Sequence, residues 1–144
     1  MSFSVDANVL LYASDRSSDR HERARRFLES CAAGPQTFYL AWPTLMAYLR
    51  IATHPRIFAA PLNPDEALDN IAALVELPHV RVVSELDGFL EAYRKVGGDM
   101  PVRGNLVSDA HLAAILLQHG VRTLYTHDRD FRKFSQLDVR DPLA

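Results

Sequence analysis

Short runs rich in β-branched and aromatic residues alternate with helical segments along this chain, and this alternation restricts its fold more than any other feature. The expected strands cover residues 3–6, 37–42, 80–83 and 123–126, with a short fifth near Val139. The expected helical segments are 8–13, 19–30, 44–52, 65–77, 87–96 and 108–119. Strands that alternate with helices usually build a parallel sheet. We therefore predict an α/β fold with helices on both faces of the sheet.

The length of 144 residues suits one domain spanning 1–144, because domains cluster at about 100–150 residues. No internal repeat or long linker divides the chain. The only cysteine, Cys31, cannot form an intramolecular disulfide, so a reducing cytoplasm is the expected location. No apolar run approaches the ~18 residues of a membrane helix, and residues 1–6 do not resemble a signal peptide. We expect no membrane contact.

Basic residues gather in three short segments rather than over the whole chain. The 18 Asp and Glu residues outnumber the 16 Lys and Arg residues, so the net charge of −2 gives no sign of nucleic-acid binding. The basic segments are 16–26, 94–95 and 129–133. Each is compatible with phosphate contacts, but the first is interleaved with acids, as the solvated face of a helix is. Both interpretations stay open.

Three aspartates fall where an α/β sheet usually binds its ligands, at the carboxyl ends of strands. Asp6 ends the first expected strand, Asp128 follows the fourth, and Asp109 opens the last long helix. Each alone has a plainer explanation: a helix cap for Asp6, the helix dipole for Asp109, and an Asx turn for Asp128 and Asp130. Together they are also compatible with a site for a hard cation, Mg²⁺ or Mn²⁺, of the kind that cuts phosphodiesters, and position alone leaves both interpretations open.

The segments around these acids resemble the three acidic motifs of PIN-domain ribonucleases. They read Val5-Asp6-Ala7-Asn8-Val9-Leu10-Leu11, Ser108-Asp109-Ala110-His111-Leu112-Ala113-Ala114 and Thr126-His127-Asp128-Arg129-Asp130-Phe131. Their order and spacing are more specific than any one motif. The resemblance spans nearly the whole chain and, more narrowly, the chain is similar to the VapC toxins of bacterial toxin–antitoxin pairs.

This resemblance implies a fold and a set of site residues. The fold is a three-layer α/β/α sandwich with a four- or five-stranded, mainly parallel sheet, formed by a single PIN domain over 1–144. Asp6, Asp109 and Asp128 match the family's catalytic, metal-binding acids, and Asp130 matches a less constant fourth position. Two further residues, Asn8 and Thr126, would orient these carboxylates.

The resemblance also implies an activity. The chain is expected to be a Mg²⁺-dependent endoribonuclease, with Mn²⁺ as a substitute ion, that cleaves RNA with a metal-activated water. It would act as the toxin of a type II toxin–antitoxin system. Its expected partners are an RNA substrate, a cognate VapB-type antitoxin and a second copy of the chain in a homodimer.

One position departs from the family pattern. The family usually supplies a glutamate from the helix after the second strand, where this chain has Ala47. No Asp or Glu occurs between Glu29 and Asp65, which puts a stable second metal ion in doubt. Asp99, on a glycine-rich segment, is a candidate replacement, though not the preferred one.

The missing glutamate keeps an alternative open, namely a catalytically weakened PIN-fold module that binds RNA or protein. An aspartate-based phosphatase is less consistent with the sequence, because that chemistry usually needs a second aspartate where this chain has Asn8. The histidines show no zinc-ligand spacing, and we interpret His111 and His127 as ordinary residues beside the acids.

Overall fold

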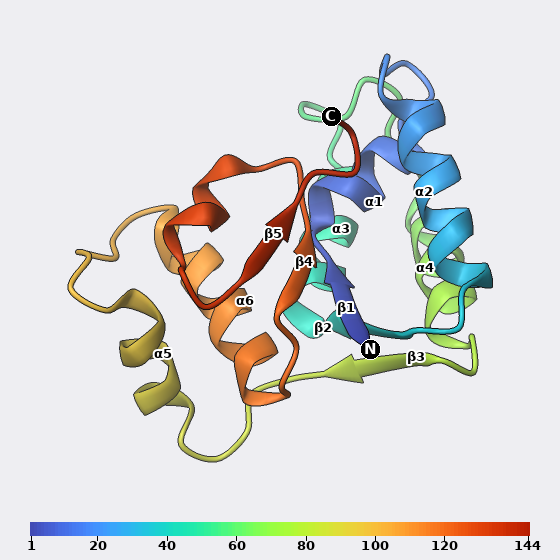
Figure 1. The fold of residues 1–144 in the computed structure, drawn as a ribbon. Helices are drawn as coiled ribbons and strands as arrows, with labels where there is room; N and C mark the ends of the chain where they lie inside the picture. The colour runs from blue at the N-terminus through green and yellow to red at the C-terminus, as the bar shows by residue number, and fades with distance from the viewer.

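A single five-stranded sheet forms the centre of the computed structural model, which describes all 144 residues (Figure 1). Its strands are β1 (Ser2–Val5), β2 (Thr37–Ala41), β3 (Val80–Val83), β4 (Thr123–Tyr125) and β5 (Asp138–Arg140). All neighbouring strands are parallel, in the order β3-β2-β1-β4-β5. The predicted four- or five-stranded, mainly parallel sheet is confirmed, with β1 in the middle.

Helices cover both faces of this sheet. They are α1 (Ala7–Ser14), α2 (His21–Ala33), α3 (Trp42–Ala52), α4 (Pro64–Val75), α5 (Phe89–Gly97), α6 (Leu106–Gln118) and the short 3₁₀ helix η1 (Arg129–Lys133). Helices α1 to α4 share one hydrophobic core with Phe3 and Val5 of β1. Helices α5, α6 and η1 share a second core with Leu124 of β4. The chain therefore has the predicted three layers, which Figure 1 shows with α5 and α6 on one side of the sheet.

The boundary between β2 and α3 differs from the prediction. The aromatic run suggested a strand to residue 42 and a helix from 44, because aromatic residues favour strands. In the structure the strand ends at Ala41, and Trp42 is already the first residue of α3. Pro43 is compatible with this start because the first turn of a helix needs no N–H donor. Trp42 therefore belongs to the helix and not to the sheet.

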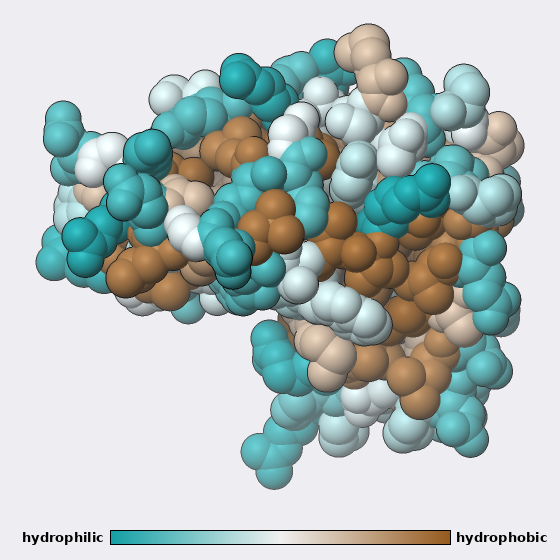
Figure 2. Space-filling model, turned by 90° about the horizontal axis from the view of Figure 1, so that it is seen from below, coloured by the Kyte–Doolittle hydropathy of each residue, from teal (hydrophilic) through white to brown (hydrophobic).

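The two ends of β1 present different chemistry. Figure 2 views the molecule from below, which is the side of the N-terminus in Figure 1. The hydrophobic residues on this face gather mainly on the right, under β1, β3 and α4. The other end of β1 leads directly into Asp6. No helix has the length and apolar composition needed to cross a membrane.

Candidate active site

Four aspartates from distant parts of the chain converge on the carboxyl edge of the central strands. Asp6 follows β1 and caps α1, and Asp128 follows β4 and caps η1. Because β1 and β4 are paired neighbours, both carboxylates come to the same edge of the sheet. Asp109 is contributed by the first turn of α6, which begins at Leu106, two residues earlier than predicted. Asp130 lies within η1.

The tightest group is formed by Asp109, Asp128 and Asp130. One carboxylate oxygen from each lies within 4.8 Å of the others. Asp6 lies outside this group, yet it is near enough for its charge to raise the pKa of Asp109. The structure thus gives Asp130, which the sequence suggested only as an additional acid, a place in the group and puts Asp6 beside it.

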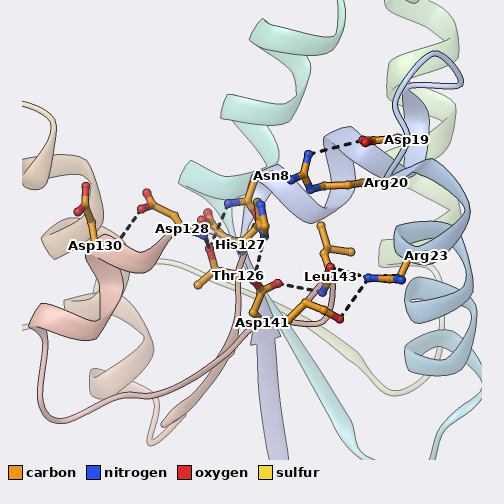
Figure 3. A network of polar contacts seen from close by, with 12 residues as sticks. Asn8, Asp19, Arg20, Arg23, Thr126, His127, Asp128, Asp130, Asp141 and Leu143 are labelled. Carbon is orange, nitrogen blue, oxygen red and sulfur yellow. Dashed lines mark hydrogen bonds and ion pairs between the residues drawn. The ribbon is translucent and has the colours of Figure 1, made fainter.

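The hydroxyl of Thr126 links both sides of this site (Figure 3). Its Oγ1 donates to Oδ2 of Asp6 over 2.9 Å and accepts from the backbone N–H of Asp128 over 3.0 Å. It also accepts from Nδ2 of Asn8 over 3.1 Å, and the amide oxygen of Asn8 accepts from the backbone N–H of His127. Thr126 is buried, so this network is shielded from water. It fixes the loop that carries Asp128 relative to Asp6.

The plainer roles expected for two of the acids also occur in the structure. Oδ1 of Asp6 accepts from the backbone N–H of Ala7 over 2.7 Å, as a helix cap does. Oδ1 of Asp128 accepts from the backbone N–H of Asp130 over 2.9 Å and forms an Asx turn. These bonds use one oxygen of each carboxylate. A capping role is therefore compatible with a second role for the other oxygen, and for Asp128 that oxygen has no protein donor.

Burial and mutual repulsion raise the pKa of two acids in the site. The pKa of Asp109 is raised to about 7, first by burial and then by the charges of Asp128, Asp6 and Asp130. Burial also raises the pKa of Asp6, although the Thr126 hydroxyl and the Ala7 N–H oppose this change. With a pKa of about 7, the carboxyl group of Asp109 is only partly ionised at neutral pH. The raised pKa indicates that the site holds more negative charge than its own residues neutralise.

The donor set fits a hard divalent cation. All the grouped side chains offer carboxylate oxygens, which Mg²⁺ and Mn²⁺ prefer over softer ligands. A cation would also relieve the repulsion that raises the pKa of Asp109. Asp109, Asp128 and Asp130, with Asp6 beside them, are the residues in a position to hold it.

The proposed replacement for the missing glutamate is not in this group. Asp99 is exposed between α5 and α6 and is not among the clustered acids. Ala47 lies half-buried in α3, which contributes no acid. The site therefore has acids on the β1, β4 and α6 side and none on the α3 side.

One neighbouring contact was not found by reasoning from the sequence. Nδ1 of His127 lies 2.9 Å from Oδ2 of Asp141, and Oδ1 of Asp141 accepts from the backbone N–H of Leu143. Arg23 of α2 donates to the backbone oxygen of Leu143, so the end of the chain is tied to the edge of the site (Figure 3). Nothing in the spacing of His127 and Asp141 indicates this pair. The other flanking histidine, His111, pairs instead with Glu85 on the surface.

Comparison with known proteins defines the class. The profile of the PIN domain family matches residues 4–137, which include all four aspartates, and the chain belongs to that family. It is similar to Ribonuclease VapC48 of Mycobacterium tuberculosis, with 46% identity over 144 residues, covering 100% of this chain and 99% of that protein. Ribonuclease VapC37 of the same organism is 32% identical over 140 residues, covering 97% and 96%. The predicted resemblance to VapC proteins is confirmed.

Solved structures agree on the fold. A chain in the crystal structure of VapBC2 from Rickettsia felis, bound to a DNA fragment from its promoter, matches with a TM-score of 0.70 and 13% identity over 98% of both chains. VapC20 of Mycobacterium tuberculosis, a toxin that cleaves the sarcin-ricin loop, matches with a TM-score of 0.66 and 19% identity, covering 90% of this chain and 92% of that one. At these identities the likeness concerns the fold alone.

Proposed function

We propose that this chain is a metal-dependent endoribonuclease. The observation that carries the proposal is the group of Asp109, Asp128 and Asp130 with Asp6 beside it. Support comes from relatives named as ribonucleases that match over nearly the full length. The preferred cofactor is Mg²⁺, with Mn²⁺ as a substitute, because the ligands are all carboxylates.

Each residue of the site has a distinct part in this reaction. Asp109, Asp128, Asp130 and Asp6 would hold the cation, which would supply charge to polarise a phosphoryl oxygen and to acidify the attacking water. Thr126 holds the carboxylate of Asp6 and the backbone before Asp128 in fixed positions. Asn8 directs the Thr126 hydroxyl toward Asp6. Nδ2 of Asn8 and the backbone N–H of Asp128 both donate to Oγ1 of Thr126. The hydroxyl proton then has only Asp6 as its acceptor.

The reaction is tested first with purified protein, free of any partner, and total cellular RNA. We expect discrete fragments with 5′-phosphate and 3′-hydroxyl ends in the presence of Mg²⁺, and none with EDTA or with the Asp109→Asn variant. Mapping the fragment ends would identify the RNA. Intact RNA in every lane, with a folded protein and with Mn²⁺ also tried, would contradict the proposal. That result would favour the binding module that the acid-free α3 keeps open.

We also propose that the chain is a toxin of a type II system, inhibited by a VapB-type antitoxin. VapBC complexes are among the solved structures that match it. An arginine of the antitoxin is the group that best suits the clustered carboxylates, because guanidinium binds carboxylates in bidentate fashion. The double variant Asp6→Asn, Asp128→Asn should bind the antitoxin more weakly in a pull-down. Undiminished binding would show that the tail does not contact these acids.

A homodimer completes the proposed assembly. Light scattering of the purified chain should give twice the mass of 16.2 kDa. A mass equal to one chain at every concentration tested would contradict this part of the proposal and leave the reaction unaffected.

A further inference from the structure

The solvent-facing side of α3 has an unusual composition. Of its 11 residues only Trp42, Met46 and Arg50 are exposed. They are spaced four residues apart and form one stripe along the helix. Trp42 is 50% exposed and Met46 is 56% exposed. The solvent-exposed face of a surface helix usually carries charged and polar residues, so an exposed tryptophan and methionine need an explanation.

The stripe begins at the same edge of the sheet as the acids. Strands β1 and β2 are parallel, with Ser2 opposite Thr37 and Ser4 opposite Tyr39. Continuing this register places Asp6 level with the last residue of β2, and Trp42 is the next residue. Neighbouring strands lie about 4.8 Å apart, so the backbone of Trp42 starts roughly one strand spacing from that of Asp6. Figure 3 shows the pale ribbon of α3 passing behind Asn8 and Asp128.

The charge of this region suits a polyanion. The chain has no acidic residue between Glu29 and Asp65, whereas Arg50, His54 and Arg56 fall within that span. Arg50 makes no ion pair. The arginines of α2 differ, because Arg25 is paired with two glutamates of its own helix. An arginine without an ion pair therefore lies on the helix that carries Trp42, about two turns further along it.

From this placement we propose that Trp42, Met46 and Arg50 form the surface that binds single-stranded RNA next to the cleavage site. An unpaired base stacks on the indole of Trp42 with Met46 at its edge, and Arg50 contacts the backbone phosphate. Stacking on an aromatic ring suits any base, because every base has a π-face. This inference rests on the proposed ribonuclease function, since it names how the same site holds its substrate.

A second copy of the chain is a poorer occupant of this stripe. A stable interface covers about 800 Å² on each partner. One large aromatic side chain buries about 150–250 Å². The stripe offers one such residue and one methionine, and its only charged group is Arg50, which makes no ion pair. The size of the stripe fits a few nucleotides better, and the unpaired Arg50 suits their phosphates.

The test uses the fact that Trp42 is the only tryptophan of the chain. The Asp128→Asn variant, which should bind RNA without cutting it, is titrated with a short mixed-sequence oligoribonucleotide. We expect quenching of the tryptophan fluorescence. In anisotropy measurements with labelled RNA, adding Trp42→Ala should weaken binding about tenfold or more, within the range for loss of one stacked base. Trp42→Phe should retain most of the affinity, and Trp42→Leu should not.

Two more variants complete the design. Arg50→Ala should lower the slope of log affinity against log salt by about one, as expected for one lost phosphate contact. Leu90→Ala is the matched control, because Leu90 is also exposed, at 64%, but lies on α5. It should change neither the affinity nor the slope.

The outcomes separate this inference from the proposed function. RNA cleavage by the wild type without quenching, and with unchanged affinity in Trp42→Ala, would overturn the inference and leave the nuclease in place. Quenching without cleavage would leave the RNA surface in place and overturn the nuclease. A change of oligomeric state in Trp42→Ala with unchanged RNA affinity would make a second copy the occupant and overturn the inference.

Discussion

The two halves of the site differ in charge although they lie on neighbouring strands. The half built by β1, β4 and α6 holds four aspartates, and burial together with repulsion from the other three raises the pKa of Asp109 to about 7. The half built by α3 holds no acid and exposes Trp42 and Arg50. The first half suits a cation, and the second suits the base and phosphate of an RNA strand.

This division gives the missing glutamate a physical interpretation. An acid at position 47 would place negative charge on the helix that we propose to face RNA. Its absence lowers the charge available to a metal ion and also removes a source of repulsion for phosphate. The departure from the family pattern is therefore compatible with a working nuclease.

The largest effect is expected on the acidic half. Asp128→Asn should reduce the rate of RNA cleavage by at least about 100-fold, because even partners that only orient metal ligands typically contribute 10–100-fold. The rate is measured on the RNA identified with the wild-type protein. Asp99→Asn is the control, since Asp99 is exposed and outside the cluster. Equal losses in both variants would show that general charge, and not the cluster, is responsible.

Removal of the Thr126 hydroxyl should have the next largest effect. Thr126→Val leaves the Asp6 carboxylate without this donor and leaves the donors of Asn8 and Asp128 without an acceptor. We expect a loss of about 10–100-fold in Mg²⁺ affinity, measured by calorimetry. The unfolding free energy should also fall by about 1–3 kcal/mol, the cost of leaving a buried polar group unpaired.

Thr126→Ser keeps the hydroxyl and is the matched control. It should retain most of the Mg²⁺ affinity of the wild type. If Thr126→Ser weakens Mg²⁺ binding as much as Thr126→Val does, keeping the hydroxyl does not preserve the site, and its hydrogen bonds alone do not account for the affinity.

Much of this site could be predicted from the sequence because its parts are local. Asp6 and Asp128 directly follow strands, and parallel strands bring their carboxyl ends to one edge. The register between β1 and β2 was not predictable in this way, because it depends on packing between distant segments. For the same reason, the start of α3 at Trp42 beside Asp6 and the contact of Asp141 with His127 could not be predicted from the sequence.

A substitution on the α3 half would remove the contrast between the two halves. Ala47→Glu adds a carboxylate at the position where the family usually has one. We expect Mg²⁺ affinity to rise by roughly tenfold, equivalent to about 1.4 kcal/mol. RNA affinity, measured without metal, should fall because the new charge repels phosphate. Ala47→Gln has a similar size without the charge, and an identical effect of both variants would contradict this explanation.

The smallest effect concerns stability and pH. Because the pKa of Asp109 is about 7 in the folded protein against an ordinary 3.8, the folded state holds a proton that the unfolded chain releases. Its stabilising contribution is complete below about pH 4 and is lost as the pH rises through about 7. Without metal, the melting temperature should therefore fall over this range. Mg²⁺ should restore it at neutral pH by binding the ionised form.

Asp109→Asn separates this effect from other titrations. Without metal, the variant should melt a few degrees higher than the wild type above neutral pH, because one of the repelling charges is gone, and added Mg²⁺ should raise its melting temperature less. Part of the pH dependence should remain, since burial also raises the pKa of Asp6. Asp99→Asn should follow the wild type throughout. A metal-free wild type that becomes more stable from pH 4 to 7 would show that repulsion within the acidic half does not control its stability.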